Sequence, residues 1–232
     1  MLPLKDTVHA RSFPVVNWLI IAANVLVFIF ETSLTARQLD RLTLAYGVVP
    51  VQLWGGGPGE WLTVFTSLFL HGGWLHVISN LWALYIFGDN VEDRMGSGRY
   101  LAFYLLSGVA AALTQAWVDP ASPIPIIGAS GAIAGVLGAY LVLFPGARVI
   151  TLVPVFVLPW FVEIPAILYL GFWFASQFFS GVLGLSAATA AAGGVAYWAH
   201  IGGFVCGLLL VGAFARRPRA QTRWYPDEYY PW

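Results

Sequence analysis

Four residues of the chain have the types and spacing that nucleophilic catalysis requires. Ser130 stands in the run "GASG" and His200 in the run "AHIGGFVCG". A serine hydroxyl becomes an effective nucleophile when a neutral histidine within hydrogen-bond reach accepts its proton. His76 and Asn80 are four residues apart, so they share a face if their segment is helical. Their ring N–H and amide NH2, with the backbone N–H of Ser130, could stabilise the oxyanion of a tetrahedral intermediate.

The elements that carry these residues must be embedded largely in lipid. Of the 232 residues, 59% are hydrophobic and 9% are charged, whereas a soluble domain carries about 25% charged residues. The formal net charge of zero argues against a nucleic-acid partner. Cys206 is the only cysteine in the sequence, which excludes an internal disulfide and a CxxC metal or redox site.

The hydrophobic pattern predicts an all-α, polytopic membrane protein with six transmembrane helices. The expected spans cover roughly residues 13–31, 72–88, 99–118, 127–144, 162–184 and 196–214. Between the fourth and fifth spans, "PGARVITLVPVFVLPWFVEIP" is apolar but contains four prolines, so we expect an interfacial connection there. The expected organisation is an N-terminal arm over 1–12, a six-helix domain over 13–214 and a basic, aromatic tail over 215–232.

The basic residues predict how the spans are oriented. Six spans put both termini and the second and fourth loops on one side of the membrane. That side collects nine basic residues, namely Lys5, Arg11, Arg94, Arg99, Arg148, Arg216, Arg217, Arg219 and Arg223. The other side holds only Arg37 and Arg41. Because basic residues accumulate in cytoplasmic loops, we expect a multi-pass protein of the cell membrane with both termini in the cytoplasm.

This topology brings the four candidate residues to a similar depth near the outer face. Ser130 falls about one turn below the outer end of the fourth span, and His200 falls near the outer end of the sixth. His76 and Asn80 fall in the outer half of the second span. The one carboxylate within a predicted span, Glu163, falls at the opposite end of the fifth. We therefore expect a Ser-His dyad without an acidic third member, in which packing orients the imidazole.

Packing is the alternative explanation for the glycines around the candidate residues. Gly128 and Gly131 could keep the space beside a nucleophile free of side chains. However, Gly131 with Gly135, and Gly203 with Gly207, also form the GxxxG spacing of closely packed membrane helices, where serine is itself common. From the fourth span alone, packing is the stronger interpretation. The shared depth of the polar residues favours catalysis.

Other interpretations of the histidines remain open. His76 and Asn80 could form a buried polar pair that joins two helices, and His71, at a predicted membrane boundary, is expected to be structural or water-facing. A zinc site is disfavoured because no carboxylate or thiol accompanies the histidines and no HExxH motif occurs. A relay in a transporter would need charge-paired residues near the bilayer midplane, and the sequence offers none.

The motifs "HGGWLHVISN", "GASG" and "AHIGGFVCG", in this order on the second, fourth and sixth spans, resemble those of the rhomboid family of intramembrane serine proteases. The stretch "EDRMGSGRYLAFYLLSG" is also similar to that family, and the resemblance covers about residues 13–214. It implies an endopeptidase that cleaves transmembrane segments of membrane proteins near the extracytoplasmic face. It implies no metal or cofactor, and transmembrane substrates and membrane lipids as the partners.

The resemblance also implies a role for each residue. Ser130 would be the nucleophile and His200 the general base, while His76 and Asn80 would line the oxyanion hole with the Ser130 amide. Gly128 would keep the backbone beside the nucleophile open. The glycines of the sixth span, Gly203 and Gly207, would let the fourth and sixth helices approach each other, and the fifth loop, "SAATAAAGGVAYWAH", would cap the site.

Two departures from the family pattern bear on the site. Many rhomboids carry a Trp-Arg pair in the first loop, whereas here Trp61 is followed by Leu62. Some bacterial members place a tyrosine one turn after the serine, against the catalytic histidine, and here that position is Ala134. Tyr197, Trp198 or another aromatic residue would then have to hold the imidazole. The alternative function is that of a catalytically inactive rhomboid-like protein that binds client transmembrane helices.

Overall fold

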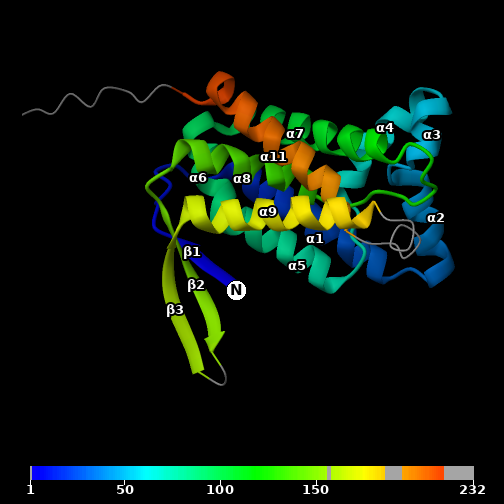
Figure 1. Cartoon of the computed structure of the whole chain (residues 1–232). Helices are drawn as coiled ribbons and strands as arrows, with labels where there is room; N and C mark the ends of the chain where they lie inside the picture. Colours follow the sequence, from blue (N-terminus) through cyan, green and yellow to red (C-terminus); the bar gives the residue numbers. More distant parts are fainter. Residues whose placement is uncertain (1, 156–157, 186–194, 217–232) are drawn as a thin grey trace, which may run out of the picture.

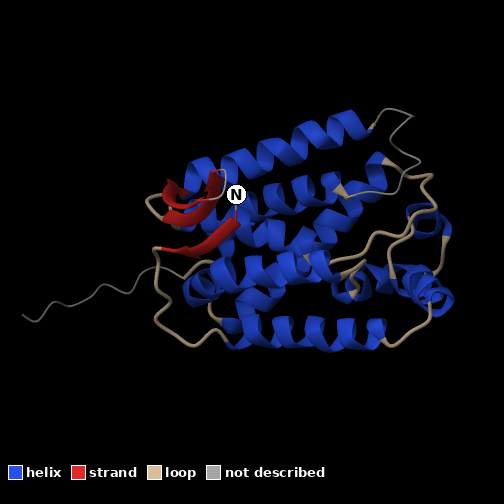
Figure 2. Cartoon of the chain, turned by 90° about the horizontal axis from the view of Figure 1, so that it is seen from below, coloured by secondary structure: helices blue, strands red, loops and turns tan. Residues whose placement is uncertain are grey.

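The computed structural model describes residues 2–155, 158–185 and 195–216, and these residues form a helical bundle with a small sheet at one end (Figures 1 and 2). The helices are α1 (Val15–Thr32), α2 (Ala36–Tyr46), α3 (Pro50–Gly55), α4 (Pro58–Thr66), α5 (Trp74–Ala83), α6 (Asp89–Met95), α7 (Ser97–Val118), α8 (Ser130–Leu143), α9 (Ala166–Gly184) and α11 (Tyr197–Phe214). A 3-10 turn, η1 (Ser67–Phe69), follows α4, and a π-helical segment, η2 (Leu84–Gly88), joins α5 to α6. The strands are β1 (Leu2–Asp6), β2 (Arg148–Val155) and β3 (Leu158–Pro165).

The lengths of the helices agree with a multi-pass membrane protein. Four helices, α1, α7, α9 and α11, are long and apolar enough to cross a bilayer, and the pair formed by 58–69 and 74–95, bent by 82°, would make a fifth. Helix α8 has 14 residues, so it is about 21 Å long, shorter than a hydrocarbon core of about 30 Å. Each of the six expected spans contains a described helix, but the count of six membrane crossings stays a prediction.

Short α8 lies at the centre of the bundle, where α7, α9 and α11 surround it (Figure 1). Every residue from Gly131 to Tyr140 is buried. The contact with α11 is a seam of glycines: a Cβ on Gly203 would overlap the carbonyl oxygen of Gly131, and a Cβ on Gly207 would overlap that of Gly135. Because these positions have no side chains, the backbones of α8 and α11 are in direct contact. Dispersion attraction across this close contact helps to hold the two helices together.

The expectation of an all-α fold is wrong for the connection before α9. Strands β2 and β3 pair antiparallel, and β1 pairs with β2 to give a three-stranded sheet of order β1-β2-β3. Strands β2 and β3 are rich in the β-branched and aromatic residues that strands favour. Prolines at these positions rule out a helix but are compatible with strands. Pro154 and Pro159 pair with each other one residue from the adjoining ends of β2 and β3, and Pro165 is the last residue of β3.

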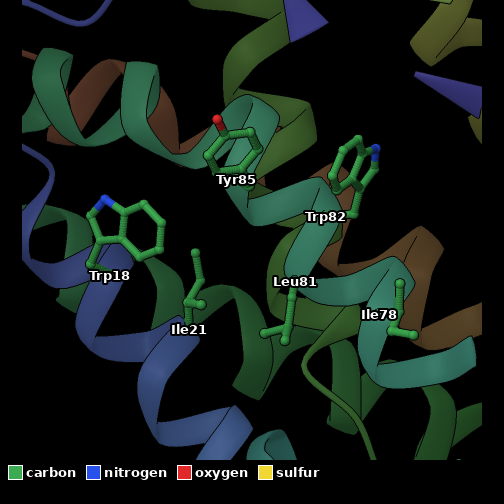
Figure 3. Close-up of a pocket in the computed structure, with 6 residues that line it drawn as sticks. All are labelled: Trp18, Ile21, Ile78, Leu81, Trp82 and Tyr85. Atoms are coloured by element: carbon green, nitrogen blue, oxygen red, sulfur yellow. The ribbon is translucent and has the colours of Figure 1, made fainter. Parts of the chain in front are cut away.

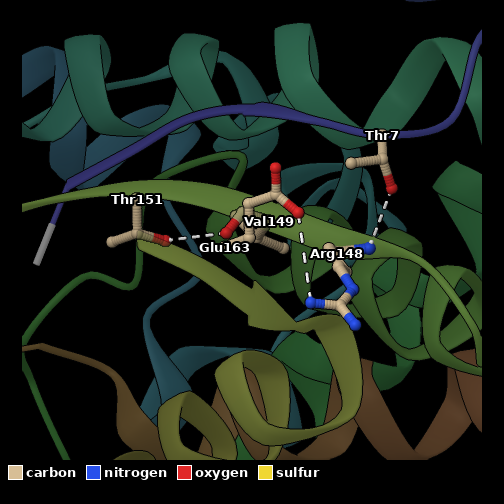
Figure 4. A network of polar contacts seen from close by, with 5 residues as sticks. All are labelled: Thr7, Arg148, Val149, Thr151 and Glu163. Carbon is tan, nitrogen blue, oxygen red and sulfur yellow. Dashed lines mark hydrogen bonds and ion pairs between the residues drawn. The ribbon is translucent and has the colours of Figure 1, made fainter. Parts of the chain in front are cut away.

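The sheet changes the expected place of the fifth helix and of Glu163. Helix α9 begins at Ala166, four residues after the predicted start of the fifth span. Glu163 lies on β3, outside any helix, and pairs with Arg148 of β2 at 4.0 Å (Figure 4). More than half of each of these two side chains is exposed, so the ion pair contributes little to stability. Thr7 joins the same network because its hydroxyl accepts the Arg148 backbone N–H at 3.0 Å (Figure 4).

The second span is longer than predicted, and a buried carboxylate holds its far end. It runs from α5 through η2 to Met95 instead of ending near residue 88. Glu92 of α6 accepts the backbone N–H groups of Val16 and Asn17 at 3.0 and 2.7 Å, which satisfies free donors in the first turn of α1. The side-chain amide of Asn17 donates to the carbonyl oxygen of Leu84 in η2 at 3.0 Å. These bonds fix α1 against the helix that carries His76 and Asn80.

Candidate active site

The structure brings Ser130 and His200 into direct contact across 70 residues of sequence. The distance between Ser130 Oγ and His200 Nε2 is 2.7 Å, a normal hydrogen-bond length for these groups. Ser130 is the first residue of α8 and therefore lies at the helix terminus itself, one turn nearer the end than the sequence predicted. His200 lies in the first turn of α11 and is 9% exposed. A hydroxyl and an imidazole in this arrangement can transfer a proton.

The imidazole has a second partner, which the sequence analysis missed. Gln177 of α9 places its Oε1 atom 2.7 Å from His200 Nδ1. One turn earlier on α9, the ring of Trp173 lies over the imidazole, with the centroids 5.8 Å apart and the planes tilted by 33°. The sequence analysis expected this aromatic contact from Tyr197, Trp198 or another aromatic residue, and in the structure it comes from Trp173. The available signal was the one glutamine in a mostly apolar span, because a polar amide there needs a partner.

A second missed glutamine fixes the start of α11. Gln115 of α7 accepts the backbone N–H groups of Trp198 and Ala199 through its Oε1 atom, at 3.1 and 3.3 Å. The residue that precedes the helix, Ala196, has no side chain that could serve as a cap. Gln115 supplies this cap from a neighbouring helix and so restrains the turn that carries His200.

On the other side of the serine, the ring of His76 lies close to the backbone of Gly128. His76 Nδ1 accepts the backbone N–H of Gly72 at 3.3 Å, so the proton of the neutral ring resides on Nε2, which can donate. A Cβ on Gly128 would lie 2.6 Å from His76 Nε2 and 3.7 Å from Ser130 Oγ. Gly128 also has a φ of 119°, which L side chains rarely adopt. Because Gly128 has no side chain, the Nε2 donor of His76 can approach the backbone beside the Ser130 hydroxyl.

Asn80, one turn after His76 on α5, is 5% exposed. Its Nδ2 atom is buried and has no hydrogen-bond partner among residues 2–155, 158–185 and 195–216. Buried amide groups are nearly always hydrogen-bonded, so such a donor calls for an explanation. A negative oxygen formed during a reaction would be one acceptor for it.

A small hollow adjoins the serine. It holds about 20 Å³, room for one water molecule, and Gly128, Ser130, Gly131, Ala196 and Ala199 are among the residues that line it. A larger, apolar hollow lies elsewhere, between α1 and the α5–η2 segment (Figure 3). It is lined by Trp18, Ile21, Ile78, Leu81, Trp82 and Tyr85. Among the described residues, no serine, histidine or carboxylate lines the larger hollow, whereas Ser130 lines the small one.

His71 lies outside the contact between Ser130 and His200. His71 is buried, and its backbone N–H donates to the carboxylate of Glu31 at 3.2 Å. This contact is structural. In the described part of the chain, no three His, Cys, Asp or Glu residues come together as metal ligands would. The expected cap in the fifth loop, over 186–194, and the tail over 217–232 lie outside the described residues.

Comparison with known proteins assigns the chain to a family. The profile of the Rhomboid domain matches residues 58–217, more than half of the chain. This chain belongs to the rhomboid family. The matched residues of this rhomboid include α5, α7, α8, α9 and α11, the five helices that carry Ser130, His200, His76, Asn80, Gln115 and Gln177.

Individual relatives support the assignment. The rhomboid is 36% identical over 138 residues to the rhomboid protease GluP of Bacillus subtilis, an alignment of 59% of this chain and 26% of that protein. It is 30% identical over 177 residues to the mitochondrial Rhomboid protein 1 of Saccharomyces cerevisiae, covering 71% of this chain and 47% of the relative. With the chloroplastic Rhomboid-like protein 11 of Arabidopsis thaliana it shares 34% over 113 residues, 49% of this chain and 40% of the relative. The chain thus spans less than half the length of each of these three relatives.

Proposed function

We propose that this rhomboid is an intramembrane serine endopeptidase in which Ser130 is the nucleophile and His200 the general base. The observation that carries the proposal is the 2.7 Å contact between Ser130 Oγ and His200 Nε2. It is supported by the relatives that are named rhomboid proteases. A protein that only held client helices would have no use for a hydroxyl paired with a base, so the inactive alternative has no observation in its favour.

In the proposed reaction, His200 Nε2 takes the proton as Ser130 Oγ attacks the scissile carbonyl carbon. The carbonyl oxygen becomes an oxyanion, for which the Nδ2 group of Asn80, the Nε2–H of His76 and the Ser130 backbone N–H are the proposed donors. The Ser130 N–H is free for this because the first N–H groups of a helix have no intrahelical acceptor. His200 then protonates the leaving amine, and a water molecule in the same place hydrolyses the acyl-enzyme.

We further propose that the substrates are transmembrane segments cut near the extracytoplasmic face, with both termini of this chain in the cytoplasm. One end of the bundle holds the sheet, where Thr7 contacts Arg148, and the Arg216 N–H donates to the Arg94 carbonyl oxygen at 2.8 Å. Three of the arginines expected on the cytoplasmic side therefore support the placement of this end in the cytoplasm. The opposite end carries α2, with its two arginines, and α3 (Figure 1). An α-helical peptide bond is shielded by its own hydrogen bonds, so a substrate must unwind locally, and a Gly or Pro near the cut lowers the cost.

Labelling with a fluorophosphonate probe tests this proposal on the purified full chain in detergent or lipid. We expect the unsubstituted protein to react and Ser130→Ala and His200→Ala to lose labelling, with a fall in peptide cleavage on the order of 10⁶-fold. Ser33→Ala, an exposed serine at the end of α1, serves as the matched control and should label normally. A folded protein that neither labels nor cleaves a Gly-containing transmembrane peptide, beside a reactive control protease, would favour the helix-binding alternative.

A further inference from the structure

We propose that Gln177 is a positioning residue that fixes both the tautomer and the rotation of His200, in the place that a carboxylate occupies in a Ser-His-Asp triad. This inference rests on the proposed function, because it assigns Gln177 to the same dyad. Its geometric basis is the 2.7 Å contact between Gln177 Oε1 and His200 Nδ1, on the side of the ring opposite the serine.

The orientation of the Gln177 amide follows from its neighbour. Ser176 donates its single hydroxyl proton to the carbonyl oxygen of Trp173 at 2.6 Å. The Ser176 oxygen can then only accept from the group 3.1 Å away on Gln177, so that group must be the NH2. The other end of the amide, which faces the imidazole, is therefore the oxygen Oε1.

This orientation dictates where the proton of the imidazole resides. An amide oxygen accepts and cannot donate, so His200 Nδ1 must carry the proton. In the neutral ring Nε2 is then unprotonated, and it accepts the hydroxyl proton of Ser130 at 2.7 Å. Only this tautomer can act as the base, and in Ser-His-Asp enzymes the wrong tautomer lowers kcat by about 10⁴-fold.

A glutamine suits this position in a membrane better than a carboxylate does. An ionised carboxylate within a span is costly and needs a paired cation, and no Lys or Arg lies on α9 or α11. An amide supplies the same acceptor oxygen without a charge. Trp173, one turn earlier on α9, covers the face of the ring, so a single helix restrains both the rotation and the tautomer of His200.

The test compares Gln177→Leu with Gln177→Glu in the full chain, with Phe179→Leu, an exposed position on the same helix, as the control. Leucine removes the acceptor oxygen and glutamate keeps it. We expect kcat to fall about 10²-fold in Gln177→Leu with KM unchanged, and to stay within about tenfold of the unsubstituted value in Gln177→Glu. Thermal stability should follow the reverse order, because leucine suits an apolar helix and a buried carboxyl does not. A purely structural role predicts that activity follows stability, which would overturn the inference.

A second readout does not depend on turnover. NMR of protein with ¹⁵N-labelled histidine rings measures the tautomer of His200, whose signals are assigned by their loss in His200→Ala. We expect a proton on Nδ1 in the unsubstituted protein and a shift toward protonated Nε2 in Gln177→Leu. Equal tautomer populations in the two proteins would contradict the inference even if the dyad is active. Absence of labelling in the unsubstituted protein, with the Nδ1 proton present, would instead contradict the proposed function alone.

Discussion

Among the residues of the site, Asn80 bears a cost that the resting protein does not recover. A buried donor without a partner costs about 1–3 kcal/mol, and Asn80 Nδ2 is such a donor within the described residues. Positions of this kind persist where a ligand or transition state provides the missing acceptor, at the expense of stability. The proposed oxyanion is such an acceptor, so the unpaired Nδ2 group supports the proposal that Asn80 is an oxyanion donor over the alternative that it forms a buried polar pair joining two helices.

Replacement of Asn80 by leucine, which keeps most of the volume, should therefore separate activity from stability. We expect kcat for a cleavable transmembrane peptide to fall about 10²- to 10³-fold, the cost of one lost oxyanion donor. The thermal unfolding midpoint should stay the same or rise, because the unpaired buried amide is gone. Ser79→Ala, at an exposed neighbouring position, controls for changes to α5. If Asn80→Leu kept its kcat, or lost activity only in proportion to stability, Asn80 would be a structural residue.

At the scale of elements, the glycine seam between α8 and α11 sets the distance across the dyad. Ser130 begins α8 and His200 lies in the first turn of α11, so a change in the spacing of these helices moves both reacting atoms apart. Gly207 meets the backbone of Gly135 two turns below the dyad, with no space for a Cβ. Two backbones in direct contact cannot adjust to an added Cβ as a flexible side chain can.

We accordingly expect Gly207→Val to abolish fluorophosphonate labelling and to lower the unfolding midpoint, because the two helices must separate. Gly212→Val, one and a half turns further along α11, is the matched control, because no atom of a neighbouring described element lies within 4 Å of its Cβ position. Both variants place the same β-branched residue in the same helix, so the propensity cost cancels. Labelling of Gly207→Val at the rate of Gly212→Val would show that the seam does not set the dyad geometry.

How far the sequence predicts the site depends on which helix carries each residue. Small-residue spacing and a histidine in a span mark Ser130 and His200 in the sequence, and a shared helix face marks His76 and Asn80. Gln177 escaped prediction because its contact depends on the rotation of α9 about its axis. Because α9 is mostly apolar on all sides, it has no amphipathic pattern that would predict which face contacts α11.

At the scale of the whole molecule, the sheet ties the N-terminus to the centre of the bundle. Hydropathy could not predict it, since β1 pairs with β2 across more than 140 residues and such long-range pairing leaves no local periodicity. Asp6, the last residue of β1, accepts a hydrogen bond from the hydroxyl of Tyr140, near the end of α8, and another from the side-chain amide of Asn90 at 3.0 Å. The first strand is thereby joined to α6 and α8.

Asp6 should make stability depend on pH. Burial raises the pKa of its carboxyl above the ordinary 3.8, and the hydrogen bond from Tyr140 lowers it by less. Below 3.8 the folded and unfolded chains both hold the proton. As the pH rises from there toward the higher folded pKa, the unfolded chain releases its proton first, so stability falls with rising pH and levels off above the folded pKa. The contribution is thus largest at low pH.

Thermal unfolding of the unsubstituted protein beside Asp6→Asn, followed in steps upward from pH 3.8, measures this dependence. Asparagine keeps an acceptor oxygen for Tyr140 and Asn90 but carries no charge, so the two proteins should melt together at the lowest pH, and Asp6→Asn should become the more stable one as the pH rises. Tyr140→Phe, which removes the hydrogen bond that lowers the pKa of Asp6, should enlarge the pH dependence in the chain that retains Asp6. A difference between the unsubstituted protein and Asp6→Asn that stays constant with pH would mean that the carboxyl is solvated, and that the backbone ladder between β1 and β2 alone holds the strand to the bundle.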